Sequence, residues 1–481
     1  MTASLPRLLL LLALALPPAT AAAQAAPDEH LPPAVARVLK SAGVPPSAVA
    51  LVVQEIDARL PRASFNAGKP MNPASVMKLV TTYAALELLG PAFAWKTEAY
   101  GTGPLADGVL EGDLLLKGYG DPKLGFERFW LLLRQLRAKG LREIRGDLVI
   151  DRSHFAPDEH DAARFDGEPL RPYNVGPDAL LLNYQAVRLD FRPDAAARSV
   201  AVSVEPAPAQ LDVVNLLKLS DAACGNAWYE GIRMDFTHSA AAARLILTGA
   251  YPAACGEKGR HVAVLDHPQF VAGVFRQLWG ELGGGLKGGL REGAVPVDAR
   301  LLAQAESPPL AEVVREINKY SNNVMARQLY LTLGAEATKR PARGADAEAA
   351  VREWLARKEL RMPELVIENG AGLSRSERIS AESLARLLAA AFASPLMPEF
   401  VASLPLAGVD GTMKKRANGS GVAGQAHVKT GYLDGVRALA GYVLDRRGKR
   451  VIVVFLANHP NSAATKAAQD ALLECAYARN C

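Results

Sequence analysis

The apolar pattern near the start of the chain predicts a long helix over residues 73–89. Its limits are an N-cap, a proline suited to the first turn and a glycine-proline stop signal, at Asn72, Pro73 and Gly90. The helix is apolar on nearly every face, which indicates burial inside a domain. Two polar side chains in its first turns, Ser75 and Lys78, therefore need an explanation.

From residue 97 to residue 270 the pattern changes to short apolar or alternating stretches separated by turn signals, which predicts a β-rich region. The last third is helical first and strand-like later. Helices are predicted over residues 310–334, as two segments joined at 321–323, and over 380–393. Three antiparallel strands and a closing helix are predicted at 427–432, 438–444, 451–457 and 463–477.

The 481 residues are 49% hydrophobic and 22% charged, a composition that predicts a large globular protein. A net charge of +5 without runs of like charge argues against nucleic-acid binding. Residues 1–23 have the features of a signal peptide: Arg7, an apolar stretch at 8–16 and small residues before a cleavage site near Ala23. A transmembrane anchor is the competing interpretation, but the apolar stretch is short for a bilayer. We expect a protein of the periplasm.

Four cysteines, in an exported chain, predict disulfides. They are Cys224, Cys255, Cys475 and Cys481. Three pairings are possible, and the two local pairings cost the least loop-closure entropy. A zinc site is the alternative, but the sequence has no C-x-x-C or H-E-x-x-H motif. The polar residues His154, Asp158 and His160 suit a solvated loop better than a metal cluster, so we expect no metal and no cofactor.

Ser75 and Lys78 stand three residues apart, so a helix would place them on one face. Burial would disfavour the charged form of Lys78 and make its amine a competent base for the hydroxyl. S-x-x-K alone is a weak signal, because a polar helix start with an extended lysine is common. Two further motifs follow in order: Ser321-Asn322-Asn323 between helices and Lys429-Thr430-Gly431 on a strand. Together they form the S-x-x-K, S-x-N and K-T-G set of serine penicillin-recognising enzymes.

The sequence resembles the low-molecular-mass class C penicillin-binding proteins, the D-Ala-D-Ala carboxypeptidase/endopeptidases also called type-four penicillin-binding proteins. The resemblance rests on NPASVMK at 72–78, GYGDP at 118–122, IDRSHF at 150–155, PYN at 172–174, ENGAGLSR at 368–375 and LPLAGVDGT at 404–412. Tyr119 and Ala371 depart from it, since small and serine side chains are common there. The resemblance implies an α+β fold, with an antiparallel sheet and helices in a transpeptidase-like domain.

The long separation of Ser75 from Ser321 indicates a domain-sized insertion between them. We expect a catalytic domain at 24–96 and 271–481, and a β-rich insertion at 97–270 that the resemblance divides into two small domains. The insertion residues Asp151 and Phe155 are expected, from the resemblance alone, to line a pocket for the peptide stem.

The resemblance also implies residue roles in an acyl-serine mechanism. Ser75 is the nucleophile and Lys78 its base, while Ser321 relays a proton and Asn323 bonds the substrate and Lys78. The substrate-binding residues are Lys429, Thr430, Gly431 and Tyr432. The first two bind the terminal carboxylate, the glycine keeps the strand edge open, and the backbone N–H groups of Tyr432 and Ser75 hold the oxyanion.

The expected partners are peptidoglycan stem peptides ending in D-Ala-D-Ala, with β-lactams as covalent inhibitors. Two other functions stay open. A β-lactamase would share the three motifs, but the sequence has no suitably spaced E-x-x-L-N element. A non-catalytic scaffold or β-lactam receptor would keep the fold without the reaction. The sequence leaves open the balance of carboxypeptidase and endopeptidase activity, a homodimer, and membrane contact at the periphery.

Overall fold

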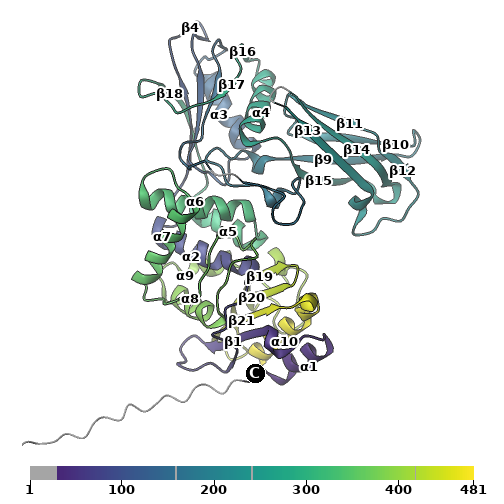
Figure 1. Cartoon of the computed structure of the whole chain (residues 1–481), viewed down its shortest axis with the longest axis vertical. Helices are drawn as coiled ribbons and strands as arrows, with labels where there is room; N and C mark the ends of the chain where they lie inside the picture. The colour runs from purple at the N-terminus through teal and green to yellow at the C-terminus, as the bar shows by residue number, and fades with distance from the viewer. Residues whose placement is uncertain (1–29, 158–159, 240–241, 418) are drawn as a thin grey trace, which may run out of the picture.

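The computed structural model describes residues 30–481 except 158–159, 240–241 and 418. The predicted signal peptide and Asp158 therefore lie outside the described residues. The chain forms a lower body of helices and one sheet, and an upper body of several small sheets (Figure 1). The lower body contains both the first described residues and the C-terminus, whereas the upper body comes from the middle of the chain.

One five-stranded antiparallel sheet organises the lower body, in the order β19-β20-β21-β1-β2. Its strands are β1 (Val49–Glu55), β2 (Ala63–Phe65), β19 (Ala426–Leu433), β20 (Val436–Leu444) and β21 (Arg450–Asn458). The three C-terminal strands match the prediction closely. β19 lies at the edge of this sheet, which leaves one side of its backbone available to a ligand.

Both faces of this sheet are covered, because side chains alternate between two hydrophobic clusters along each strand. Leu51, Val453 and Phe455 point to the face that is packed by α1 (Pro33–Ser41) and α10 (Lys466–Ala478). The opposite face packs against a helical layer. Its helices are α2 (Lys78–Leu89), α5 (Leu310–Tyr320), α6 (Asn323–Thr338), α7 (Gly344–Arg357), α8 (Ala381–Ala393) and α9 (Met397–Ser403).

The upper body contains a second five-stranded sheet, in the order β17-β8-β6-β3-β18. Its strands are β3 (Lys96–Gly101), β6 (Leu114–Gly118), β8 (Leu148–Asp151), β17 (Leu290–Glu292) and β18 (Arg300–Glu306). A small sheet beside it contains β4 (Leu105–Ala106), β5 (Val109–Leu110), β7 (Glu143–Ile144) and β16 (Gly285–Leu286). The helices α3 (Phe126–Ala138) and α4 (His267–Glu281) contribute to the same hydrophobic cluster.

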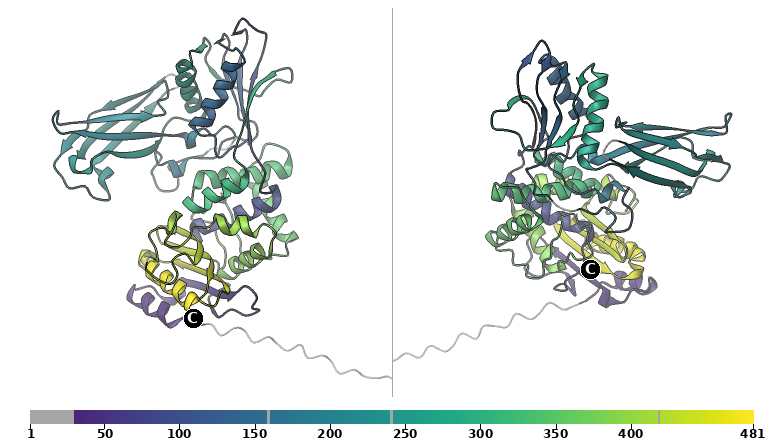
Figure 2. Two further views of the ribbon diagram at one scale, coloured as in Figure 1. Left: turned by 180° about the vertical axis from the view of Figure 1, so that it is seen from behind. Right: turned by 45° about the horizontal axis from the view of Figure 1, so that its top comes forward.

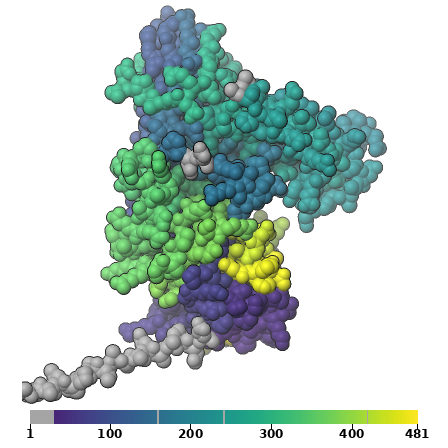
Figure 3. Space-filling view, viewed as in Figure 1, coloured from purple at the N-terminus to yellow at the C-terminus, as the bar shows by residue number. Residues whose placement is uncertain are grey.

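Two further sheets form an arm that projects to one side of the molecule (Figures 1 and 2). One contains β9 (Ala186–Asp194), β10 (Ser199–Glu205) and β15 (Lys258–Ala263). The other contains β11 (Leu211–Asn215), β12 (Lys218–Ser220), β13 (Ile232–His238) and β14 (Ala243–Pro252). In the space-filling view the blue-to-teal residues of the upper body lie above the green helical layer (Figure 3).

The upper body extends further along the chain than the predicted limit at residue 270. The side chains of Phe270, Leu278 and Ala303 belong to its hydrophobic cluster, so α4 and β16–β18 pack with the insertion. The chain enters the upper body at Lys96, at the start of β3, and leaves it at Glu306, at the end of β18. These two residues pair with each other, so the entry and the exit lie side by side. An insertion whose ends are neighbours leaves the host fold continuous.

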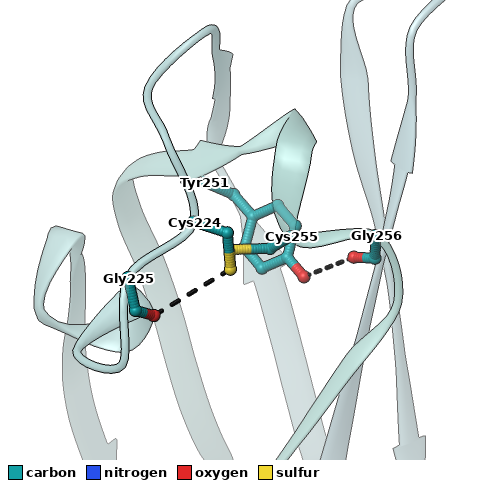
Figure 4. Close-up of a disulfide and its surroundings, with 5 residues drawn as sticks. All are labelled: Cys224, Gly225, Tyr251, Cys255 and Gly256. Carbon is teal, nitrogen blue, oxygen red and sulfur yellow. Dashed lines mark hydrogen bonds between the residues drawn. A yellow bond between two sulfur atoms is a disulfide. The ribbon is translucent and has the colours of Figure 1, made fainter.

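The structure contains the two local disulfides that the sequence favoured among its three pairings. Cys224 bonds Cys255 within the arm, beside Tyr251, whose hydroxyl donates to the carbonyl of Gly256 at 2.6 Å (Figure 4). Cys475 bonds Cys481 at the end of α10. Among the described residues, none of the helices is both long and apolar enough to cross a membrane.

Candidate active site

Ser75 lies in a short turn of 3-10 helix, Ala74–Met77, that leads into α2. The predicted helix therefore starts later than expected, and Lys78 is its first α-helical residue. The Nζ atom of Lys78 lies 3.0 Å from the Oγ atom of Ser75. Ser75 is partly exposed, whereas Lys78 is completely buried. A reactive hydroxyl thus faces solvent with an enclosed amine directly behind it.

The turn before Ser75 is held in an uncommon conformation. Ala74 has a φ of 45°, which non-glycine residues rarely adopt, so neighbouring contacts must maintain it. Asn72 does so instead of capping α2: its Oδ1 accepts from the Ala74 N–H at 2.9 Å, and its Nδ2 donates to the Ser374 carbonyl at 2.8 Å. Asn458 exchanges two hydrogen bonds with the Asn72 backbone, at 2.8 and 3.0 Å. The nucleophile's turn is thereby fixed by Asn72 and by two distant parts of the chain, at Ser374 and Asn458.

The Ser321-Asn322-Asn323 segment turns the chain between α5 and α6, as predicted. Ser321 adopts the left-handed conformation with φ 59°, and Asn322 caps α6 by accepting from the Met325 N–H at 3.0 Å. Asn323 is then the first residue of α6, and its Oδ1 lies 2.6 Å from the Nζ of Lys78. The tight turn is what aims Ser321 and Asn323 at one place.

Lys78 has a third partner, the backbone carbonyl of Ala371, which accepts a hydrogen bond from its Nζ. Burial lowers the pKa of Lys78 well below its usual value of 10.5, and the positive charges of Lys429 and Arg327 lower it further. The carboxylate of Glu377 acts in the opposite direction. The sequence pattern indicated an enclosed lysine, but its contact with Ala371 and its interaction with Glu377 come only from the fold.

Lys429 on β19 reaches the same site from the sheet. It is completely buried, and its Nζ donates to the Ser321 Oγ and to the Thr430 carbonyl, each at 2.8 Å. Burial lowers the pKa of Lys429 to about 7. The hydroxyls of Thr430 and Thr412 lie 2.8 Å apart. Thr412 belongs to none of the three motifs, although it ends one of the stretches that carry the resemblance.

The exposed edge of β19 presents the backbone of Tyr432 toward a possible ligand. The N–H of Val428 donates across this edge to Pro405 at 2.9 Å, and Thr430 and Tyr432 share its direction because a strand alternates with period two. Gly431, which is expected to keep the edge of β19 open for the substrate, also allows β19 to pack closely on the serine turn. A Cβ there would lie 2.5 Å from the Pro73 carbonyl oxygen, so a larger residue would push β19 away from the serine turn.

A pocket of about 320 Å³ lies beside this cluster, and its wall includes Asn369 and Leu373, which flank Ala371. Asp151 and Phe155 line a different pocket, of about 480 Å³, whose wall also includes Leu331 of α6. The carboxylate of Asp151 is buried and accepts from the Val295 N–H at 2.9 Å and from Lys117 Nζ at 3.1 Å. Ser75 is not part of the wall of that pocket. The walls of both pockets include His160, Pro177 and Leu331.

Two of the three residues of the possible metal cluster, His154 and His160, lie within the described part of the chain and have other contacts. The ring of His154 packs against Tyr119 and Phe155, with ring centroids 5.4 and 5.3 Å away, and His160 Nε2 lies 2.6 Å from the carbonyl of Asn174. Within the described residues, no group of three His, Cys, Asp or Glu side chains is placed to hold a metal ion.

Several known proteins are similar to this chain in sequence and in fold. The sequence matches the D-Ala-D-Ala carboxypeptidase 3 (S13) family over residues 31–478. A D-alanyl-D-alanine carboxypeptidase from Actinomadura is 30% identical over 424 residues, covering 85% of this chain and 77% of the relative. Penicillin-binding protein 4 from Haemophilus influenzae superposes with a TM-score of 0.76 at 24% identity, covering 92% of this chain and 99% of that protein. A predatory endopeptidase from Bdellovibrio bacteriovorus superposes with a TM-score of 0.51 at 16% identity, covering 88% and 90%.

A helix-covered antiparallel sheet with a serine turn at its edge is the fold of the penicillin-binding proteins, and the predicted α+β class with its β-rich insertion is confirmed. Because the family match runs from α1 to α10, the chain belongs to the D-Ala-D-Ala carboxypeptidase 3 (S13) family. It is a low-molecular-mass class C penicillin-binding protein and a serine-type D-Ala-D-Ala carboxypeptidase. These relatives do not support the two alternative functions, a β-lactamase and a non-catalytic scaffold or β-lactam receptor.

Proposed function

We propose that Ser75 and Lys78 carry out the carboxypeptidase reaction through an acyl-enzyme. Lys78, as the neutral amine, accepts the proton of Ser75, and the serine oxygen attacks the carbonyl carbon between the two D-alanines. The carbonyl π electrons move to its oxygen, which accepts hydrogen bonds from the backbone N–H groups of Ser75 and Tyr432. The observation that carries this proposal is the 3.0 Å contact of a fully buried amine with a partly exposed hydroxyl.

The later steps use the groups around Lys78. Ser321, which accepts a hydrogen bond from Lys429, relays the proton from Lys78 to the leaving D-alanine amine, the C–N bond breaks, and Lys78 is neutral again. Asn323 orients the substrate amide and Lys78. Water then attacks the ester carbon while the neutral Lys78 accepts its proton. The bond to the Ser75 oxygen breaks, that oxygen takes the proton back from Lys78, and the shortened peptide leaves. Lys429 and Thr430 bind the terminal carboxylate of the substrate by charge and hydroxyl.

We propose stem peptides of peptidoglycan ending in D-Ala-D-Ala as the substrates, and hydrolysis of cross-links as a second activity of the same centre. Both reactions cleave a bond after a D-alanine and differ only in the group that leaves. The pocket lined by Asn369 and Leu373 is proposed to hold the peptide stem, because these residues belong to the loop whose Ala371 carbonyl bonds Lys78. The shared wall residues make the pocket of Asp151 and Phe155 a continuation of that path, and these two residues are proposed for its far end.

The domain division and the cellular location are also proposals. The hydrophobic clusters favour a catalytic domain at 24–95 and 307–481, with 96–306 as the insertion. The separate sheets in the two halves of the insertion favour two small domains within it. Two disulfides favour the periplasm, where such bonds persist, and a leader at 1–23 would direct the chain there. We also propose a homodimer, which gel filtration tests directly.

Intact mass spectrometry after incubation with benzylpenicillin, followed by peptide mapping, tests the acyl-enzyme. We expect one adduct, on the peptide that contains Ser75. Ser75→Ala should lose both the adduct and the release of D-alanine, whereas Ser47→Ala, at an exposed serine outside the site, should keep both. An adduct that survives in Ser75→Ala would refute the assignment, and consumption of penicillin without an adduct would favour a β-lactamase.

A further inference from the structure

The loop after Ile367 lies directly against the catalytic helix. The Ala371 carbonyl accepts from Lys78, and one turn further along α2 the Thr81 hydroxyl donates to the Gly370 carbonyl at 2.7 Å. A Cβ at Gly370 would lie 2.8 Å from both Thr81 Oγ1 and Tyr330 Cβ, so the loop fits closely between α2 and α6. The position of the Ala371 carbonyl is therefore set by the loop as a whole.

This carbonyl matters because of the number of hydrogens on a neutral amine. A neutral lysine carries two N–H donors and one lone pair, whereas the ammonium form carries three donors. The Asn323 Oδ1 and the Ala371 carbonyl can only accept, so they use both N–H groups of the neutral form. The lone pair is then left for the third neighbour, the Ser75 hydroxyl, whose proton it must take.

The side chain that holds this loop is Glu377. It is completely buried, and its Oε1 accepts from the backbone N–H groups of Glu368 and Asn369, both at 3.1 Å. The side chain of Asn369 continues the connection, because its Oδ1 accepts from the Ala371 N–H at 2.9 Å. One carboxylate is thus linked to the Ala371 peptide by two successive sets of hydrogen bonds.

Glu377 also contributes charge. Its second oxygen, Oε2, is buried without a hydrogen-bond partner among the described residues. Burial raises the pKa of Glu377, and the carboxylate of Glu368 raises it further, while the two backbone donors and Lys78 oppose that rise. The charged groups that act on Lys78 are the cations Lys429 on β19 and Arg327 on α6, and the carboxylate of Glu377. Glu377 is the group in that set that compensates the positive charge.

We propose that Glu377 is a positioning residue of the reaction, which holds the Ala371 carbonyl on Lys78 and so directs the lone pair of the amine at Ser75. This rests on the proposed function of Lys78 as the base. Ala371 takes part through its backbone, which explains why the side chain there can depart from the common serine. Glu377 does not touch the substrate, and its effect passes through the loop and through its charge.

The test is the pH dependence of the acylation rate constant with benzylpenicillin. Glu377→Ala releases the loop and removes the charge, so the maximal rate should fall about tenfold or more and the acid limb should move to lower pH. Glu377→Gln keeps an oxygen that can accept from both N–H groups but has no charge. It should recover most of the maximal rate while retaining the shift of the acid limb.

Glu364→Ala is the matched control. Glu364 is another carboxylate of this region that accepts two hydrogen bonds, from the Ser380 N–H at 3.1 Å and its hydroxyl at 2.5 Å, and it is not among the charged groups that act on Lys78. Its replacement should lower the unfolding temperature and leave the acid limb in place. An unshifted acid limb in Glu377→Gln would overturn the proposal, even where Glu377→Ala fails to fold. Full activity of Lys78→Arg would instead overturn the proposed role of Lys78 as the general base, on which the role of Glu377 depends.

Discussion

Gly372 packs so closely on Ala74 that a Cβ on this glycine would lie 1.9 Å from the Ala74 carbonyl oxygen and 2.7 Å from the Ser75 nitrogen. It also has a φ of 77°, where side chains are strained. The loop that supplies the Ala371 carbonyl to Lys78 is therefore in direct backbone contact with the turn that carries the nucleophile.

Gly372→Ala should displace the serine turn and reduce acylation by benzylpenicillin by about 100-fold, since small shifts of reacting groups are costly. Gly448→Ala is the control, because Gly448 has the same φ of 77° and nothing within 4 Å of its added Cβ. Both variants should lower the free energy of unfolding by roughly 1–3 kcal/mol, because an alanine is strained at this φ. Equal acylation rates for the two variants would show that the contact with Ala74 is unimportant.

Lys78→Ala should reduce the acylation rate by about 100-fold or more, the scale of a lost general base. Lys78→Arg should be equally slow, because a guanidinium does not release its proton near neutral pH. Lys69→Arg, an exposed position, serves as the control. Stopped-flow measurement with a chromogenic cephalosporin gives these rates, and a wild-type rate in either Lys78 variant would place the base elsewhere.

The pKa of Lys429, about 7 because of burial, predicts an alkaline limit on activity. The substrate carboxylate needs the protonated form, so kcat/KM for a peptide ending in D-Ala-D-Ala should fall as the pH rises above about 7. Lys429→Arg keeps its proton throughout this range and should move the fall to higher pH. A peptide with an amidated C-terminus should show a weaker alkaline fall, and identical profiles for the two peptides would contradict carboxylate binding by Lys429.

The same pKa predicts how stability depends on pH. Between about pH 7 and pH 10.5 the unfolded chain keeps the Lys429 proton that the folded chain has released, so the unfolded state binds more protons and stability rises with pH. The slope approaches about 1.4 kcal/mol per pH unit for one proton. Lys429→Met should flatten the curve and raise stability at neutral pH, because no charge is buried.

Urea unfolding at several pH values measures this effect. Lys415→Met, at an exposed lysine, is the control and should leave the slope unchanged. A Lys429→Met variant with the slope of the wild type would show that Lys429 stays protonated in the folded protein.

The Cys224–Cys255 disulfide should stabilise the arm more than Cys475–Cys481 stabilises the end of α10. Their sequence separations are 31 and 6, which correspond to about 4 and about 2 kcal/mol in the loop-entropy estimate. Differential scanning calorimetry of Cys224→Ser and Cys481→Ser compares them. Both should still be acylated at Ser75, because neither cysteine pair contacts the serine turn. Loss of acylation in Cys224→Ser would instead show that the arm supports the catalytic body.

The sequence by itself determined the elements and the chemistry. Local signals suffice for α5, α6 and α8, because caps and apolar periodicity are properties of short segments, and apolar runs bounded by turn residues predicted β19 to β21. The three motifs identified Ser75, Ser321 and Lys429 because their order is a property of the chain. The start of α2 was misplaced, because Asn72 bonds Ala74 and Ser374 in the fold and not the helix end.

The tertiary structure decided what surrounds those residues. The Ala371 carbonyl that accepts from Lys78 lies 293 residues further along the chain. The carboxylate of Glu377, which acts on Lys78 through its charge, is also distant in sequence, and no local pattern encodes either interaction. Likewise, only strand pairing shows that Lys96 and Glu306 are neighbours, and the linear sequence does not indicate it. Propensity and motif depend on neighbouring residues in sequence, whereas the pKa of a buried lysine depends on charges and carbonyls that folding brings to it.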